Sequence, residues 1–183
     1  MAPPDTIYQL RVTILDTDPP VWRRVQAPTT ITLFGLHLVL QATMGWENQH
    51  LYRFDIHGTE YGEPDPDGLL EFRNARRNKL SSKVKVGDTF TYEYDFGDSW
   101  EHEILVEQES IPHPEVSYPV CVAGERACPP EDCGGPMGFE DLLEAISDPR
   151  HEEHEDMLVW IGYDFDPSAF DIGEANARLA GGI

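Results

Sequence analysis

Apolar and polar residues alternate along two separate regions of the chain, and each region predicts a β-hairpin. Residues 7–15 (IYQLRVTIL) and 21–25 (VWRRV) alternate on either side of a short proline-containing turn. Residues 88–96 (DTFTYEYDF) and 100–106 (WEHEILV) do the same around Gly97-Asp98. Successive side chains of a strand point to opposite faces, so each strand presents one apolar face. A short turn between two such strands predicts antiparallel pairing.

A different spacing, typical of an α-helix, appears at residues 33–44. Apolar residues recur there every three or four positions. Thr32 precedes the stretch and has the hydroxyl of a helix N-cap. Gly45 follows it and is the residue type that most often ends a helix. The sequence therefore predicts one helix with both ends defined.

The C-terminal part also has helical spacing. Residues 138–147 place their apolar side chains on one stripe. Residues 156–161 predict a second, short helix, or the end of one that starts near His151. The pair Asp166-Pro167 is typical of a helix opening. Asp171 predicts a cap before a last helix at residues 175–179.

Three regions lie between or beside these elements. Residues 50–56 (HLYRFDI) predict a further strand, whereas residues 58–68 are rich in Gly, Pro and Asp and predict a loop. Residues 112–136 show no periodicity and contain six prolines and all three cysteines. A loop of this length inside a compact domain needs something that orders it.

Together these elements predict an α+β fold. It has an antiparallel sheet built from the N-terminal and central hairpins, one helix packed on that sheet, and a C-terminal helical segment. A chain of 183 residues suits a single domain. Within it we distinguish a sheet-rich part (1–111), a Pro/Cys-rich loop (112–136) and an acidic helical part (137–183).

Charge is distributed unevenly along the chain. The formal net charge is -21, and residues 91–183 carry 23 acidic and only 3 basic residues. Such a half repels a phosphate backbone and argues against a nucleic-acid surface. It suits solubility or a basic protein partner. No apolar run reaches the roughly 18 residues of a membrane span, and the N-terminus lacks the features of a signal peptide, so we expect a cytoplasmic protein.

One segment has the opposite charge. Residues 73–85 contain six basic and no acidic residues, among them Arg73, Arg76, Arg77 and Lys79. One interpretation is a phosphate-binding patch that contacts DNA. The other, which we favour, is an exposed loop whose charges are balanced by acidic residues of the same chain.

The cysteines suggest a metal site. Cys121, Cys128 and Cys133 lie close together in the loop that lacks its own core, and zinc would order such a loop through its ligand bonds. His102 is the predicted fourth ligand, with Asp132 in reserve. The spacing does not match the short C-x₂-C pairs of structural zinc sites. The alternative is that the cysteines are small buried apolar residues.

A carboxylate and imidazole set suggests a second site. Asp95, Asp98 and His102 lie around the turn of the central hairpin, where they would suit metal binding or acid–base chemistry. For Asp98 a role in the turn itself is the favoured interpretation. Asp95 stays a further candidate metal ligand.

Longer motifs extend over nearly the whole chain, from about Ile7 to Leu179. They are Pro20-Val21-Trp22-Arg23, Met44-Gly45-Trp46 with residues 50–54 (HLYRF), residues 94–102 (YDFGDSWEH), Cys121 with residues 124–135 (GERACPPEDCGG), and residues 164–167 (DFDP) with Phe170-Asp171. Together they resemble the plasmid pRiA4b ORF-3-like family. The resemblance implies an α+β fold of its own type and little about function.

The resemblance also implies a link with mobile genetic elements, because family members are often labelled as their passenger proteins, sometimes as resolvases. A resolvase needs a nucleophilic serine among arginines and a basic DNA-binding module. Ser81, Ser82 and Ser99 have no such surroundings in the sequence.

Three functional hypotheses follow. The first is a non-enzymatic binding or accessory protein, stabilised by zinc, with an acidic face for a protein partner. The second is a metal-dependent enzyme with an open site near His102 and the cysteine loop. The third is a protein that contacts DNA through residues 73–85.

Overall fold

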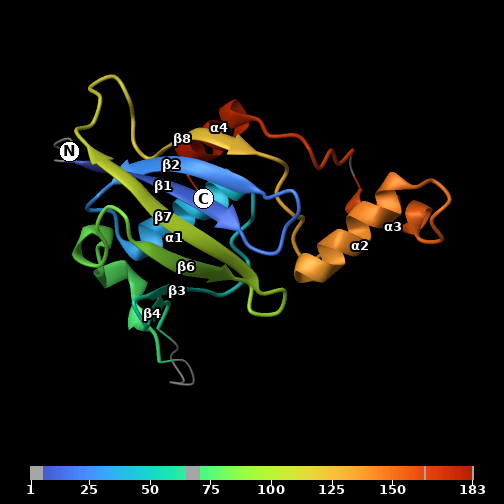
Figure 1. Ribbon diagram of the computed structural model, residues 1–183, viewed down its shortest axis with the longest axis horizontal. Coiled ribbons are helices and arrows are strands. Elements are labelled where there is room, and N and C mark those ends of the chain that lie inside the picture. Colours follow the sequence, from blue (N-terminus) through green and yellow to red (C-terminus); the bar gives the residue numbers. More distant parts are fainter. Residues whose placement is uncertain (1–5, 65–70, 163, 183) are drawn as a thin grey trace.

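An eight-stranded sheet forms the centre of the protein. The computed structural model describes residues 6–64, 71–162 and 164–182. The strand order is β5-β4-β3-β6-β7-β1-β2-β8 (Figure 1), and neighbouring strands are antiparallel except for β4 and β5, which are parallel. The strands are β1 Ile7–Ile14, β2 Trp22–Pro28, β3 Tyr52–Ile56, β4 Thr59–Gly62, β5 Arg73–Asn74, β6 Thr89–Tyr94, β7 Trp100–Ser110 and β8 Val120–Glu125.

Four α-helices and two short 3₁₀ turns complete the described structure. They are α1 Leu33–Met44, α2 Gly135–Ser147, α3 His154–Ile161, α4 Ile172–Gly181, η1 Ala75–Arg77 and η2 Leu80–Ser82. The predicted ends of α1 are confirmed. The Thr32 hydroxyl accepts a hydrogen bond from the Gly35 N–H, and Gly45 has the left-handed φ of 91°. A left-handed residue at this position satisfies the last carbonyls of a helix.

Both predicted hairpins are present. Strands β1 and β2 pair with each other, as do β6 and β7, and β7 joins the two hairpins by pairing with β1. The inward face of β7 carries Trp100, His102, Ile104 and Val106, all buried. The alternation of side chains along β7 therefore identifies the face of the sheet that carries the core. Helix α1 covers this face with buried side chains that include Leu33, Leu36 and Leu40 (Figure 1).

Three local predictions are wrong. The segment 112–136 contains strand β8, which pairs with β2 at the edge of the sheet. The segment 58–68 contains strand β4, while its residues 65–68 lie outside the described part of the chain. Asp166-Pro167 does not open a helix, because the Asp166 carboxylate accepts hydrogen bonds from the N–H and hydroxyl of Ser168 in a turn.

The C-terminal part leaves the sheet and then returns to it. Helices α2 and α3 project from the end of the sheet, and α4 comes back to lie beside β8 and α1 (Figure 1). The side-chain amide of Asn176 in α4 bonds to both backbone groups of Cys121 in β8. This contact satisfies part of an edge strand that would otherwise be open. The α+β architecture is thus confirmed, and among the described helices none is long and apolar enough to cross a membrane.

Candidate functional site

A cavity of about 630 Å³ lies between the sheet and the returning C-terminal segment. Its walls are residues 43–47 at the end of α1 and just after it, residues 127–132 of the Pro/Cys-rich loop, and parts of the chain from 160 to 178, with Arg23 of β2. The volume falls within the range of small-molecule sites, about 300–1,000 Å³. Three segments far apart in sequence therefore enclose one space.

Arg23 is the buried charge on the wall of this cavity. Its residue exposure is 2%. Its Nε–H donates to the carbonyl of Thr43 (3.0 Å), and its Nη1 donates to the carbonyls of Trp22 (2.8 Å) and Glu125 (2.9 Å). One face of the guanidinium lies 4.1 Å from the centre of the Phe170 ring. These contacts fix the orientation of the group.

The positive charge of Arg23 has no carboxylate partner. Within the described residues, no Asp or Glu oxygen lies within 4.0 Å of its guanidinium, and Nη2 donates no hydrogen bond. Burial lowers the pKa of Arg23 from its ordinary value, yet a guanidinium stays protonated in proteins. Buried charges are normally paired, and the described residues give this cationic group no counter-ion.

A second guanidinium, that of Arg178 in α4, adds to this charge. It lies directly over Gly45, where a Cβ atom would overlap its Nη1. Its Nη2 donates to a Glu174 carboxylate oxygen at 2.7 Å. Arg178 also contributes to the lowered pKa of Arg23, after the larger effect of burial. Arg178 already has Glu174 as its partner, so Arg23 is the cation of the cavity wall that has no carboxylate among the described residues.

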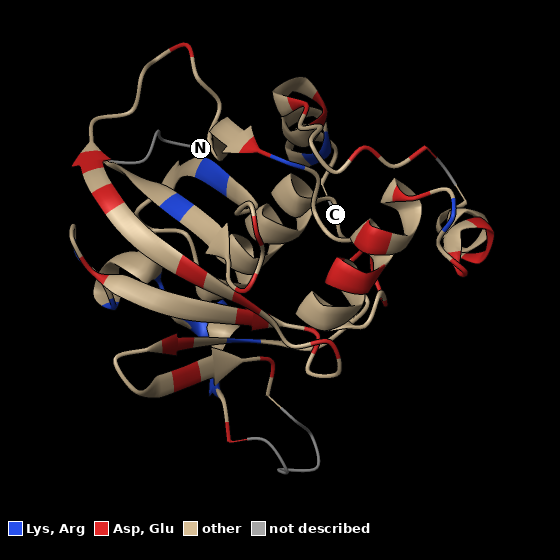
Figure 2. Ribbon diagram, turned by 45° about the vertical axis from the view of Figure 1, so that its right-hand side comes forward, with Lys and Arg blue, Asp and Glu red and all other residues tan. Residues whose placement is uncertain are grey.

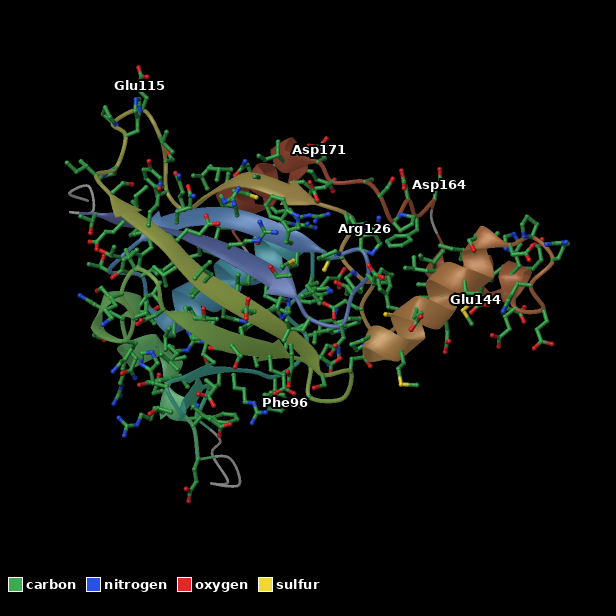
Figure 3. The ribbon with its side chains drawn as sticks, in the orientation of Figure 1. Phe96, Glu115, Arg126, Glu144, Asp164 and Asp171 are labelled. Atoms are coloured by element: carbon green, nitrogen blue, oxygen red, sulfur yellow. The ribbon has the colours of Figure 1, made fainter. Side chains whose placement is uncertain are left out.

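The rest of the wall includes acidic and aromatic residues. Glu47, Asp132 and Asp164 line it together with the rings of Trp46 and Phe165. Asp164 lies on the stretch that leads from α3 toward α4, where Figure 3 labels it. A cavity lined by two guanidiniums, several carboxylates and aromatic rings suits a ligand with groups of both signs.

The cavity wall offers no activated nucleophile among its described residues. The Thr43 hydroxyl donates to carbonyls of its own helix, those of Val39 and Leu40. Burial raises the pKa of the Cys128 thiol far above its ordinary value, so it stays protonated in the neutral range. Nucleophilic catalysis needs a lowered pKa or an adjacent base. The cavity is therefore better suited to binding than to covalent chemistry.

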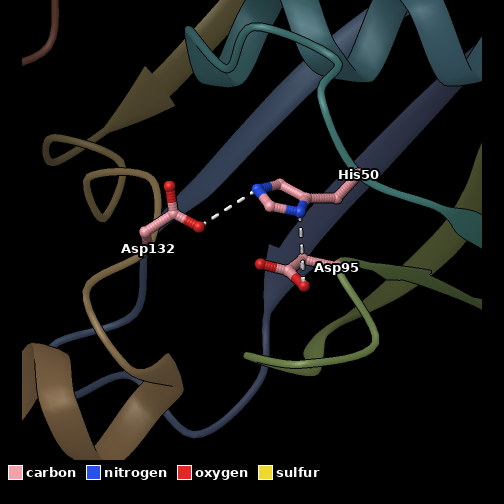
Figure 4. A group of neighbouring side chains, drawn as sticks. All are labelled: His50, Asp95 and Asp132. Atoms are coloured by element: carbon pink, nitrogen blue, oxygen red, sulfur yellow. Dashed lines mark ion pairs between the residues drawn. The ribbon is translucent and has the colours of Figure 1, made fainter.

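A second constellation, the His50 group, shares Asp132 with the cavity wall and comprises His50, Asp95 and Asp132 (Figure 4). The His50 Nε2 is 3.1 Å from Asp132 Oδ1, and the Nδ1 is 3.7 Å from Asp95 Oδ1. A third carboxylate, that of Glu131, is 3.8 Å from Nε2. One potential ligand atom from each of His50, Asp95 and Asp132 lies within 4.8 Å of the others.

The loop that carries Glu131 and Asp132 is held against the sheet. The Glu131 carboxylate accepts hydrogen bonds from the Glu47 N–H (2.8 Å) and the Tyr94 hydroxyl (3.1 Å). The indole N–H of Trp46 donates to the Pro129 carbonyl at 3.0 Å. These bonds join the Pro/Cys-rich loop to the chain that follows α1 and to the end of β6.

The four predicted zinc ligands do not converge. Among the described residues, the His50 group is the one set of three or more His, Cys, Asp or Glu side chains whose ligand atoms lie so close together. Cys121 lies in β8 and His102 in β7, with β1 and β2 between them, a separation of roughly 14 Å at about 4.8 Å per strand spacing. The loop after β7 returns to the far edge of the sheet, which the sequence did not indicate. Zinc binding by the chain stays a prediction.

Each predicted ligand has other surroundings. Cys121 is buried, and its thiol donates to the Ala123 carbonyl at 3.4 Å. Burial raises the pKa of Cys133 to about 12. His102 is fully buried, and its Nδ1 lies 2.9 Å from the Trp100 carbonyl and 3.2 Å from that of Tyr92. Burial lowers the pKa of His102 to about 4, so it is neutral. Asp98 accepts a hydrogen bond from the Gly134 N–H rather than facing His102.

The basic segment at residues 73–85 lies at the opposite edge of the sheet. Of the four residues named as candidate DNA contacts, Arg76 is the one with an ion pair among the described residues, at 3.1 Å from Glu63. Its guanidinium also lies 3.4 Å from the centre of the Phe34 ring. Nucleic-acid contact through Arg73, Arg76, Arg77 and Lys79 stays a prediction.

Two residues of the site were missed in the sequence analysis. The alternation of residues 21–25 places Arg23 on the same side as the buried Val21 and Val25, so an inward arginine was readable from the pattern. His50 precedes β3, and nothing in the local pattern indicates that it faces Asp95 and Asp132. Asp95 and Asp132 were predicted as candidate metal ligands, but together with His102 and the cysteines rather than with His50.

Comparisons with known proteins place the chain among relatives of unknown function. The profile of the plasmid pRiA4b ORF-3-like protein family matches residues 6–174. The uncharacterized protein y4hQ of Sinorhizobium fredii is 42% identical over 180 residues, which cover 95% of this chain and 91% of the relative. The crystal structure of a protein of unknown function, MM3350 of Methanosarcina mazei Go1, superposes with a TM-score of 0.87 at 36% identity, and covers 93% of this chain and 98% of the other.

Proposed function

The chain belongs to the plasmid pRiA4b ORF-3-like family, and we propose that it is a binding protein for a small zwitterionic molecule. The observation that carries the proposal is the buried guanidinium of Arg23, which lies on the cavity wall without a carboxylate partner among the described residues. A carboxylate of the ligand would supply that partner. A charge-assisted hydrogen bond of this kind contributes about 1.5–3 kcal/mol.

The remaining wall supports a ligand that also carries a positive charge. Carboxylates at Glu47, Asp132 and Asp164 would repel a second negative group and attract an amine. The chain as a whole has a formal net charge of -21, which disfavours a multiply charged anion such as a phosphate ester. The rings of Trp46 and Phe165 offer apolar surface for the body of the ligand. Amino acids and related amino carboxylates have this chemistry.

The proposal is tested by calorimetry and thermal melting with three sets of compounds. These are amino acids, monocarboxylates without an amine, and amines without a carboxylate. We expect at least one amino carboxylate to raise the melting temperature and to bind more tightly than its two partial analogues. Absence of binding by every amino carboxylate at millimolar concentration would contradict the proposal.

A pair of arginine variants locates the site. Arg178→Gln removes the guanidinium over Gly45, whereas Arg150→Gln removes an exposed arginine that pairs with Asp148 outside the cavity. We expect Arg178→Gln to weaken ligand binding about tenfold or more, since one ionic hydrogen bond is lost, and Arg150→Gln to leave it unchanged. Equal effects of the two substitutions would place the ligand elsewhere.

An association with mobile genetic elements stays a prediction.

A further inference from the structure

Beyond the proposed ligand, we infer that the His50 group binds one divalent transition-metal ion, of the class of Zn²⁺ or Mn²⁺, through His50, Asp95 and Asp132. The side chains come from three different segments: the connection between α1 and β3, the turn after β6, and the loop between β8 and α2 (Figure 4). Glu131 is available as a further ligand. The charge, burial and geometry of the group all favour a bound ion.

The charges of the group do not balance. Three carboxylates, those of Asp95, Glu131 and Asp132, lie within 4.0 Å of the single imidazole of His50. In the described part of the chain, none of the three has a Lys or Arg within that distance. Even a protonated imidazole would leave two negative charges without a counter-ion. A divalent cation supplies that charge.

Asp95 shows that the excess negative charge of the group is not confined to exposed side chains. Its side chain is 9% exposed. Its Oδ1 accepts a hydrogen bond from the Gly97 N–H at 2.9 Å, whereas its Oδ2 accepts none from the described residues. Figure 4 shows the second oxygen directed to the side of the imidazole on which Asp132 lies. A carboxylate that is mostly buried normally has a cationic partner or several hydrogen bonds. Oδ2 is not among the described buried atoms that lack a partner, so solvent reaches it and an ion can bind there.

The geometry suits one ion. Potential ligand atoms of His50, Asp95 and Asp132 all lie within 4.8 Å of one another. Metal bonds of about 2.0–2.2 Å place ligands up to roughly 4.4 Å apart, so small side-chain rotations suffice. One imidazole with two or three carboxylates indicates a first-row metal, since imidazole favours zinc, iron or copper and carboxylates favour harder ions.

The ion would order the Pro/Cys-rich loop, the role that the sequence predicts for zinc bound by cysteines. Asp132 lies in the Pro/Cys-rich loop, and His50 and Asp95 lie at the end of the sheet. One ion bound by all three would cross-link the loop to the sheet, and its binding free energy would stabilise the fold. The ligands are nitrogen and oxygen rather than sulfur.

The test is equilibrium dialysis of chelator-treated protein against Zn²⁺ and, separately, Mn²⁺, followed by metal analysis and thermal melting. We expect one ion per chain and a melting temperature that rises on metal addition and falls again with chelator. His50→Ala and Asp95→Asn should each weaken metal binding at least tenfold. Loss of a residue that only supports a metal ligand already weakens binding about tenfold or more, and loss of the ligand itself weakens it further.

Two control variants distinguish the His50 group from metal binding elsewhere on the chain. His57→Ala removes an exposed histidine that faces a single carboxylate, Asp88, at 3.6 Å, and should leave metal binding unchanged. Cys133→Ala removes a predicted thiolate ligand and should also leave it unchanged. Absence of binding at 100-fold excess over micromolar protein overturns the inference. So does binding that survives His50→Ala but is lost in Cys133→Ala, or that His57→Ala weakens as much as His50→Ala.

Discussion

Two histidines in the core are held neutral by their surroundings. His37 in α1 lies 2.8 Å from the Tyr92 hydroxyl through Nδ1 and 2.6 Å from the Asn48 amide oxygen through Nε2, and it stacks on Tyr52. The amide oxygen can only accept, so Nε2 carries the proton and Nδ1 accepts from the tyrosine. His102 bonds to backbone carbonyls through Nδ1, while its Nε2 is buried without a partner among the described residues.

These histidines predict a loss of stability in mild acid. Burial lowers the pKa of both His37 and His102 to about 4, whereas an unfolded histidine titrates near 6.5. As the pH falls from about 6.5 to 4, the unfolded chain takes up protons that the folded chain does not, and the folded state loses stability. Each histidine contributes a slope of about 1.4 kcal/mol per pH unit inside that window.

The measurement is urea unfolding at several pH values between 7 and 4.5, for the wild type and for His102→Phe. We expect the variant to show a shallower decline, because one of the two titrating groups is gone. Phenylalanine keeps the ring in place and removes the Nε2 that has no partner. A slope identical to that of the wild type would show that His102 is protonated in the folded state or does not control the pH dependence.

At the scale of elements, local signals were enough for some parts of the fold and not for others. The hairpins and α1 follow from alternation, apolar spacing and the caps at Thr32 and Gly45. Strand β8 was missed because its pairing with β2 is made across about 100 residues of sequence. The cavity and the His50 group have the same origin, since strand order and the path of the loop bring Asp132 close to Arg23 on one wall and to His50 in the group, and neither is encoded locally.

The start of α2 is packed too closely for any side chain at Gly138. A Cβ atom there would overlap the backbone carbonyl oxygen of Cys133. Alanine normally stabilises a helix interior relative to glycine by about 1 kcal/mol, but backbone overlap of this kind costs more. We therefore expect Gly138→Ala to destabilise the protein by about 2 kcal/mol.

Gly181→Ala is the matched control, because Gly181 also lies in a helix and no described atom comes within 4 Å of a Cβ built there. We expect it to be neutral or slightly stabilising. Denaturant midpoints of the two variants compare them directly. A neutral Gly138→Ala would mean that the connection from Cys133 into α2 adjusts its backbone without loss.

At the scale of the whole molecule, charge is separated along the chain. Most basic residues lie in residues 1–90, whereas α2 and α3 are marked by acidic residues (Figure 2). In the described part of residues 91–183, the basic side chains with ion pairs are Arg150 and Arg178, each with an acid two or four residues away. The acidic surplus is therefore not neutralised within this half, and a basic protein partner for it stays a prediction.

This imbalance predicts that salt stabilises the protein. Repulsion among like charges destabilises a folded state, and the Debye length falls from about 30 Å at 0.01 M salt to about 8 Å at 0.15 M. We expect the melting temperature to rise by a few degrees over that range, since about 1 kcal/mol corresponds to about 2–4 °C for a chain of this size.

Chelator in all samples removes any contribution from divalent ions. A triple variant of α3 and its preceding turn, Glu152→Gln, Glu153→Gln and Glu155→Gln, should show a smaller rise, because three of the repelling charges are gone. A melting temperature that falls with salt would instead mean that attractive ion pairs, such as Arg24–Glu107 at 2.7 Å, outweigh the repulsion.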